Sequence, residues 1–186
     1  MRILIVYASR YGATRNIAER IADVASKLGA ETQLFEINSV PRNVVPYLSD
    51  VVVLASSVYF GKHSRKLAKF AMAQRTNLMR VKSVFVSVSG AARSAAGRPS
   101  AEANASRFLS HTGWAPDRIE YFGGSEPYTK YDFFTRWFVQ RLAKKMGRTV
   151  DPSRDYVFTD WEAVDRFAGE LARPQREVDT KVAALS

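Results

Sequence analysis

The sequence contains no cysteine and only two histidines. Without cysteine the chain has no disulfide framework, no thiol nucleophile and no dithiol redox pair, so any redox chemistry requires a bound cofactor. The two imidazoles, His63 and His111, have no partner at metal-ligand spacing, and we expect no metal site. No serine stands in a nucleophile elbow, and no side chain is indicated as a catalytic acid or base, so hydrolase chemistry has no support.

A long hydrophobic run is also missing. The longest largely apolar stretch, residues 51–60, is far shorter than the ~18 residues that a membrane helix needs. The opening "MRILIVYAS" carries one cation and an apolar run shorter than a signal-peptide core, so it is better interpreted as a buried strand. We expect a protein that stays in the cytoplasm, where it can still lie on a membrane surface.

Acidic residues are outnumbered, with 18 Asp and Glu against 28 Lys and Arg and a formal charge of +10. A positive surface attracts phosphate, carboxylate or anionic lipid. Nucleic acid is another polyanion, but the sequence contains no recognised nucleic-acid-binding motif, and we expect no nucleic-acid partner.

Short apolar runs predict five β-strands, over residues 3–8, 32–37, 51–55, 84–88 and 119–122. Continuous apolar strands that alternate with amphipathic helices are typical of a parallel sheet covered on both faces. We therefore predict a doubly wound α/β fold with the common strand order 2-1-3-4-5. Residues 1–172 are expected to form one domain, and residues 173–186 a disordered tail.

Helical spacing follows the first strand, where Ile17, Ile21 and Val24 share one face and Gly29 is placed to end the helix. Apolar spacing predicts further helices over residues 67–78 and 101–109. A last helix is predicted from the capping-box spacing of Thr159 and Glu162. Its acidic residues, Asp160, Glu162 and Asp165, suit the start of a helix better than a catalytic carboxylate pair.

The connection between the fifth strand and the last helix is far longer than the ~2–6 residues that such a connection normally needs. We treat residues 125–150 as a helical insertion with basic and aromatic residues. From residue 128 to 150 six cations face one acid, a charge of +5, which is half of the excess over the whole chain. Such a helix either rests on anionic lipid with aromatic side chains at the interface, or covers the core with those aromatics packed inward.

The first loop, "SRYGAT", leads from a strand into a helix. Ligands of doubly wound sheets bind beyond the carboxyl ends of the strands, where a helix N-terminus offers free N–H groups to an anion. Ser9 and Thr14 add hydroxyls, Gly12 permits a positive φ, and Arg10 adds charge. The loop has neither the lysine of a P-loop nor the G-x-G-x-x-G pattern, so it predicts a phosphate site outside both classes. The alternative is an ordinary turn with a helix cap.

Two further loops follow strands at the same end of the predicted sheet. "SSVYFGKH" offers Tyr59 and Phe60 as a platform for a flat ring, unless both side chains belong to the core. "SVSGAARSAAGR", residues 87–98, is rich in small residues that let a flat ligand approach the backbone. A phosphate cradle, an aromatic platform and a small-residue loop together indicate a flavin mononucleotide (FMN) site.

The segment "ILIVYASRYGATRNIAERIA" resembles the opening of flavodoxin-like proteins. "RFLSHTGWAPDRIEYFGG" and "DYVFTDWEAVDRFAGELA" are similar to a narrower group, the quinone-dependent protoporphyrinogen dehydrogenases of bacterial haem synthesis. The resemblance extends from about residue 2 to 172. It implies a flavodoxin-like fold and FMN contacts from all three loops, namely Ser9, Arg10, Tyr11, Gly12, Ala13, Thr14, Val58, Tyr59, Phe60, Gly61, Ser87, Val88, Ser89, Gly90, Ala91 and Arg93.

The resemblance also implies an activity. In that group FMN takes electrons from protoporphyrinogen IX and passes them to menaquinone or ubiquinone, so the protein is expected on the inner face of the cell membrane. The chain departs from the group where Tyr59 and Phe60 replace an arginine and a tyrosine before Gly61. Residues of the insertion expected to contact substrate or membrane are Tyr128, Lys130, Tyr131, Phe133, Arg136, Trp137 and Arg141.

Other functions stay open at this point. The nearest enzymatic alternative is a flavodoxin-like NAD(P)H:quinone reductase. A non-catalytic FMN electron shuttle and a binding module without flavin belong to different classes. Electron-carrier flavodoxins are usually acidic because they dock on basic partners, and a charge of +10 disfavours that role. The sequence leaves a homo-oligomer open.

Overall fold

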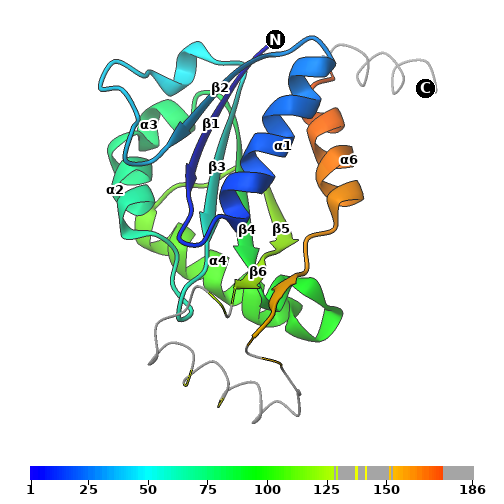
Figure 1. Ribbon diagram of the computed structural model, residues 1–186. Helices are drawn as coiled ribbons and strands as arrows, with labels where there is room; N and C mark the ends of the chain where they lie inside the picture. The colour runs from blue at the N-terminus through cyan, green and yellow to red at the C-terminus, as the bar shows by residue number, and fades with distance from the viewer. Residues whose placement is uncertain (128, 130–136, 138–140, 142–150, 152, 174–186) are drawn as a thin grey trace, which may run out of the picture.

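A parallel sheet of five strands forms the centre of the protein (Figure 1). The computed structural model describes residues 1–127, 129, 137, 141, 151 and 153–173. The strand order β2-β1-β3-β4-β5 confirms the predicted order 2-1-3-4-5. The strands are β1 (Arg2–Ala8), β2 (Glu31–Glu36), β3 (Val51–Ser57), β4 (Lys82–Ser89) and β5 (Arg118–Gly123).

Both faces of the central strands are buried. Along β1, Ile3 and Ile5 pack into one hydrophobic cluster, whereas Leu4 and Val6 pack into the other. Successive side chains of a strand point to opposite faces, so a continuous apolar run fills two cores at once. This explains why the central strands were visible in the sequence as unbroken apolar runs.

Two helices cover one face, α1 (Ala13–Lys27) and α6 (Trp161–Leu171), and Figure 1 shows them side by side in front of the sheet. Their buried residues, among them Ile17 and Phe167, belong to one cluster. The other face is covered by α2 (Arg65–Ala73), α3 (Arg75–Leu78) and α4 (Arg98–Thr112). Short 3-10 turns lie at Pro46–Leu48, Ala91–Arg93 and Ala95–Gly97.

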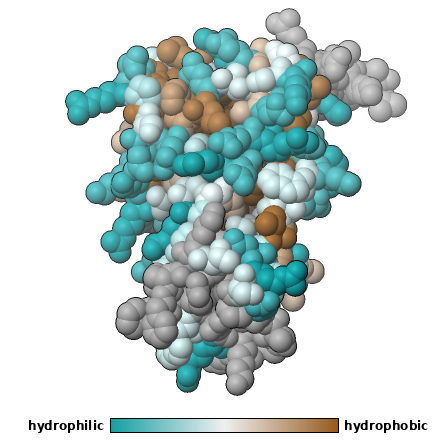
Figure 2. Space-filling view, in the orientation of Figure 1, coloured by the Kyte–Doolittle hydropathy of each residue, from teal (hydrophilic) through white to brown (hydrophobic). Residues whose placement is uncertain are grey.

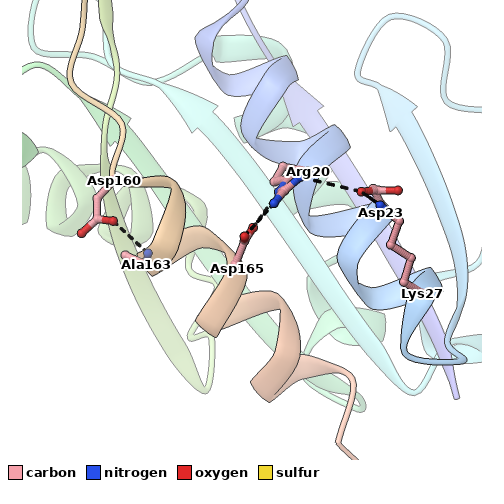
Figure 3. A network of polar contacts seen from close by, with 6 residues as sticks. All are labelled: Arg20, Asp23, Lys27, Asp160, Ala163 and Asp165. Atoms are coloured by element: carbon pink, nitrogen blue, oxygen red, sulfur yellow. Dashed lines mark hydrogen bonds and ion pairs between the residues drawn. The ribbon is translucent and has the colours of Figure 1, made fainter.

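Ion pairs join α1 and α6 at the surface (Figure 3). Arg20 donates to both carboxylate oxygens of Asp165, at 2.6 and 2.7 Å. The hydrogen bond from Arg20 lowers the pKa of Asp165. Within α1, Lys27 pairs with Asp23 at 2.8 Å. Hydrophilic side chains accordingly form a band over these two helices in the space-filling view (Figure 2).

Two predicted helix features differ in the structure. The helix expected over residues 67–78 is interrupted at Gln74, but Leu78 beyond the break is still buried, so apolar spacing did not reveal the interruption. The last helix is capped by Asp160, whose carboxylate accepts from the Ala163 amide at 2.9 Å. The predicted cap was Thr159, but its hydroxyl instead donates to the carbonyl of Gly123 at 2.8 Å.

Two short strands outside the main sheet were not predicted. β6 (Ser125–Pro127) pairs antiparallel with β7 (Asp155–Val157). Thr129 extends this pairing, because its amide and hydroxyl both donate to Asp155, at 3.0 and 2.8 Å. The start of the segment predicted as an insertion, residues 125–127, therefore lies next to residues 155–157, just beyond the carboxyl end of β5. None of the helices in the described part of the chain has the length and apolar character needed to span a bilayer.

Candidate functional site

The loop between β1 and α1 is shaped by Gly12. This residue has φ of 99°, which side chains other than glycine rarely adopt, and it is the N-cap of α1. The Gly12 amide donates to the hydroxyl of Ser9 at 3.1 Å. No side chain caps the amides that follow, and the first turn of α1 contains no acidic residue. The exposed amides of a helix N-terminus favour an anion, and no acid is placed here to compete for them.

Thr14 supplies a second observation at this helix start. Its side chain is fully buried, and its hydroxyl oxygen makes no hydrogen bond within the described residues. A buried hydroxyl without a partner costs roughly 1–3 kcal/mol, so such groups are rare unless a ligand satisfies them. Uncapped amides and an unpartnered buried hydroxyl at the same helix start fit the phosphate group predicted from the sequence.

The loop after β3 contains a tight turn that presents aromatic rings. The Tyr59 amide donates to the Lys62 carbonyl at 2.8 Å, and the Lys62 amide donates back at 3.1 Å. Phe60 has φ of 46° and Gly61 has φ of 71°, so both central residues of the turn are left-handed. Phe60 is 53% exposed and Tyr59 is partly buried, so the alternative that both rings belong to the core is wrong.

Arg10 connects the first loop to this turn. Its guanidinium carbon lies 3.6 Å from the ring centroid of Tyr59 and 5.6 Å from that of Tyr11. The two tyrosine rings are 6.1 Å apart and tilted by 58°. Burial raises the pKa of the Tyr11 phenol, and a hydrogen bond with Arg10 acts in the opposite direction. Three side chains from two loops thus form one cationic aromatic group.

A cavity of about 70 Å³ lies between the loops that follow β1, β3, β4 and β5. We call it the loop cavity. Three of its lining residues, Ser57, Gly124 and Ser125, were not predicted from the sequence. All three lie at or just after the carboxyl end of a strand, where ligands of parallel sheets bind, so this rule could have identified them. A Cβ atom at Gly124 would lie 3.2 Å from the Val88 side chain, so glycine keeps this wall open. The predicted residues that line the cavity are Ser9, Arg10, Tyr11, Ala13, Thr14, Val58, Tyr59, Val88, Ser89 and Gly90.

Six predicted residues do not line the loop cavity. Gly12 shapes the first loop as the N-cap of α1 but is not part of the lining. Phe60 lines a neighbouring cleft, and a Cβ atom at Gly61 would face α4, 3.7 Å from the Asn104 side chain. Ser87 is fully buried within β4, and Ala91 lies in the 3-10 turn beyond Gly90. Arg93 extends away from the cavity, with its guanidinium carbon 4.6 Å from the ring centroid of Phe158.

The two histidines occupy different environments. His63 is buried and meets the stacked rings of Phe85 and Phe108 edge-on, at centroid distances of 5.0 and 5.3 Å, and its Nε2 lies 3.4 Å from the hydroxyl of Ser87. Burial lowers the pKa of His63 to about 4, against the opposing effect of nearby main-chain carbonyls. His111 is exposed on α4. Throughout the described ranges, no three His, Asp or Glu side chains are grouped in a way that could hold a metal ion.

Most residues predicted to contact substrate or membrane lie outside the described residues, namely Tyr128, Lys130, Tyr131, Phe133 and Arg136. The two that are described come together: the guanidinium carbon of Arg141 lies 5.5 Å from the ring centroid of Trp137. Trp137 is 53% exposed, so its ring does not pack into the core.

Comparisons with known proteins agree with this geometry. Residues 4–153 match the family model described as a flavodoxin domain. The chain is 30% identical to the protoporphyrinogen IX dehydrogenase (quinone) of Escherichia coli strain K12, over 92% of this chain and 95% of that protein. It is 29% identical to a protein of the same name from Leishmania major, over 92% of this chain and 74% of that protein.

Among solved structures, a short-chain flavodoxin associated with a bacterial microcompartment has the same fold, with a TM-score of 0.56 and 13% identity over 93% of this chain and 99% of that one. At this identity the likeness concerns the fold alone. The family model, in contrast, matches most of the sequence, and the Escherichia coli relative is covered almost from end to end. The chain therefore belongs to the flavodoxin family, whose cofactor is FMN.

Proposed function

We propose that this protein oxidises protoporphyrinogen IX to protoporphyrin IX and passes the electrons to a membrane quinone. The single observation that carries the choice of reaction is the similarity to the Escherichia coli enzyme over nearly the whole of both chains. When bound, FMN supplies two-electron redox chemistry, which the side chains of this cysteine-free protein do not offer. The protein's part is to bind the cofactor, orient it and shield it from water.

The lining of the loop cavity suits two roles, binding of the FMN phosphate and contact with its ring system. The amides at the start of α1 and the hydroxyls of Ser9 and Thr14 would hold the FMN phosphate, and Arg10 would neutralise part of its charge. Val58, Tyr59, Val88, Ser89 and Gly90 line the same cavity and would contact the rest of the cofactor. A volume of about 70 Å³ holds only part of an FMN molecule, and the exposed turn around Phe60 lies beside it and would offer the ring system further contact.

The insertion between β6 and β7 supports a membrane role. It follows β6, whose first residue, Ser125, lines the loop cavity, so β6 links the insertion to the proposed cofactor site. Trp137 is exposed and lies beside the cation of Arg141, a combination suited to the boundary of an anionic bilayer. We assign this insertion to contact with the inner face of the cell membrane, where quinone is dissolved.

An anaerobic experiment tests the reaction. Protoporphyrinogen IX added to the FMN-loaded protein should bleach the blue absorbance of the flavin, and menaquinone or ubiquinone should restore it. NADH and NADPH are added in parallel, because rapid bleaching by either one alone would favour an NAD(P)H:quinone reductase. A flavin that stays oxidised in the presence of protoporphyrinogen IX would overturn the proposed substrate.

Co-sedimentation with vesicles tests the membrane contact. The double variant Trp137→Ala/Arg141→Ala should bind vesicles containing phosphatidylglycerol less well than the wild type. A matched control is Trp161→Ala/Arg166→Ala, which removes an exposed tryptophan and an arginine from α6. Equal vesicle binding by all three proteins would leave the insertion without a membrane role.

A further inference from the structure

A second, larger cleft adjoins the loop cavity on the side of β2. Its volume is about 710 Å³, within the range of roughly 300–1,000 Å³ that is usual for ligand sites. It shares Ser9, Arg10, Ser57 and Tyr59 with the loop cavity, so a molecule in one space touches the walls of the other. We call it the basic cleft, after the four cations in its lining, Arg10, Lys62, Arg65 and Lys66.

The cations of the basic cleft are not paired with acids of the described part of the chain. Lys62 and Arg65 are exposed, and neither forms an ion pair with any described residue, whereas Arg98 on the neighbouring α4 pairs with Glu102 at 2.8 Å. Lys66 donates to the neutral amide oxygen of Asn38 at 2.5 Å. Like charges close together without acids to offset them repel one another, and a bound anion relieves that repulsion.

Among the described residues, Glu36 is the only acid that lines the basic cleft, and it is already engaged. Its carboxylate accepts from the Asn38 amide group at 3.1 Å and lies 3.6 Å from a guanidinium nitrogen of Arg15. Four cations against one acid leave the lining with a net charge of +3. The cleft therefore favours a ligand with more than one negative charge.

The rim between the two spaces is aromatic. Phe60 adopts a left-handed φ of 46°, the only positive φ of a non-glycine residue in the described part of the chain. Such a backbone costs free energy and persists only where the surroundings hold it. The turn keeps the ring of Phe60 half exposed on the wall of the basic cleft, 4.4 Å from the ring of Tyr59, which lines both spaces. An apolar flat molecule can lie against these rings and still reach the loop cavity.

We propose that the basic cleft holds the two propionate groups of the tetrapyrrole substrate. The carboxylates pair with Lys62 and Arg65, while the apolar macrocycle lies against Phe60 and Tyr59, next to the loop cavity. This inference rests on the proposed function and adds to it the site and the residues that select the substrate. Paired cations recognise a dicarboxylate through charge-assisted hydrogen bonds, which are the stronger kind.

Equilibrium binding to the FMN-loaded protein tests this assignment. Protoporphyrin IX and its dimethyl ester differ only at the two propionate groups, which are charged carboxylates in the first and neutral methyl esters in the second, and quenching of porphyrin fluorescence reports the binding of each. The wild type should bind the diacid at least about tenfold more tightly than the ester. Lys62→Ala/Arg65→Ala should lose that preference, with affinity for the ester unchanged.

A matched control is Arg80→Ala/Lys82→Ala, which removes the same amount of charge near the amino end of β4. The loop cavity and the basic cleft lie beyond the carboxyl ends of the strands, so this control is at the other end of the sheet. It should keep the preference for the diacid. Since Lys62 and Arg65 are exposed, their variant should fold and retain the flavin spectrum of the wild type. Diacid affinity within about twofold of the wild type in Lys62→Ala/Arg65→Ala would overturn the inference.

Two other results would also overturn it, and they are distinguishable. If the wild type oxidises protoporphyrinogen IX and the variant keeps its KM, the proposed function stands and the basic cleft is not the carboxylate site. If the wild type binds neither porphyrin and oxidises no porphyrinogen, the proposed function itself fails. Loss of binding to phosphatidylglycerol vesicles with unchanged diacid affinity would instead make these cations a lipid contact.

Discussion

The guanidinium group of Arg10 lies over the ring of Tyr59, 3.6 Å from its centroid. This contact joins the loop after β1 to the turn after β3, two segments that are far apart in sequence and meet at the carboxyl end of the sheet. A cation over an aromatic face contributes about 0.5–2 kcal/mol, depending on how far water is excluded. Arg10 therefore orders the walls of the loop cavity and also places a positive charge where the phosphate is proposed.

Replacing Arg10 by alanine should weaken FMN binding. A charge-assisted hydrogen bond contributes about 1.5–3 kcal/mol, which corresponds to a Kd increase of roughly 10- to 100-fold. Arg10→Lys keeps the charge but loses the planar group over Tyr59, so its effect should be intermediate. Flavin fluorescence, titrated with the apoprotein, measures all three affinities. Equal Kd values for wild type and Arg10→Ala would remove Arg10 from the cofactor site.

Thr14→Val should have opposite effects on the two forms of the protein. In the apoprotein it removes a buried hydroxyl that has no hydrogen-bond partner, so the free energy of unfolding should rise by roughly 1 kcal/mol. In the FMN complex it removes a proposed phosphate ligand, so Kd should rise roughly tenfold or more. Urea unfolding of the apoprotein and FMN titration measure the two effects separately.

Thr14→Ser is the matched control, because it keeps the hydroxyl and removes only a methyl group. It should bind FMN nearly as well as the wild type and gain no stability as an apoprotein. The hypothesis would be contradicted if Thr14→Val lowered the free energy of unfolding of the apoprotein and left the Kd for FMN unchanged, since both expected effects would then be absent.

The central sheet and the first helix could be predicted because the sequence patterns that indicate them are local. The three central strands are buried on both faces and therefore appear as continuous apolar runs, and the face of α1 repeats at helical spacing until Gly29 ends it. The common strand order then brings the loops that follow β1, β3 and β4 to one edge of the sheet. Those loops contain most residues of the loop cavity.

Side-chain direction and long-range pairing could not be predicted. The sequence does not reveal that Ser87 lies in the core beside His63 while Ser89, two residues further on the same face of β4, lines the loop cavity, because that depends on where the strand ends relative to the neighbouring loops. The pairing of β6 with β7 joins segments about thirty residues apart and has no periodic signal. Gly124 and Ser125 were missed because they follow the last predicted strand, and only the loops after the first, third and fourth strands were considered as cofactor loops.

The motifs that carry the narrower resemblance have structural positions. Trp114 is 1% exposed and its indole nitrogen donates to the hydroxyl of Ser83 at 3.2 Å, while Asp117 accepts from the Ser83 amide at 2.7 Å. In the segment before α6, Thr159 binds the end of β5 and Asp160 caps the helix. These residues stabilise the strands and helices from which the cavity loops extend. They therefore identify related proteins, but they do not line the loop cavity themselves.

Burial of His63 should make stability depend on pH. Its pKa is about 4 in the folded protein and near 6.5 when unfolded, so the unfolded chain binds a proton that the folded protein does not. Stability should be unaffected by this group above about pH 6.5 and should fall as the pH drops towards 4, by on the order of 3 kcal/mol in all. Urea unfolding at a series of pH values measures this loss.

His63→Gln should flatten the pH dependence between about 6.5 and 5, a range that lies above the titration of carboxylates such as Asp165. His111→Gln, which removes the exposed histidine of α4, is the matched control. A slope that persists in His63→Gln would mean that another group carries the proton linkage.

Gly12 and Gly29 allow the backbone cost of a glycine substitution to be separated from its effect on the cofactor. Both have positive φ, 99° and 88°, and a Cβ atom at either position would meet nothing within 4 Å. Alanine should therefore destabilise the apoprotein at both sites by about 1–2 kcal/mol through backbone strain alone. Only Gly12 lies at the proposed phosphate, so Gly12→Ala should also weaken FMN binding severalfold, while Gly29→Ala should leave Kd unchanged. Thermal unfolding and FMN titration of both variants make the comparison, and equal Kd values would mean that the loop does not need this conformation to bind FMN.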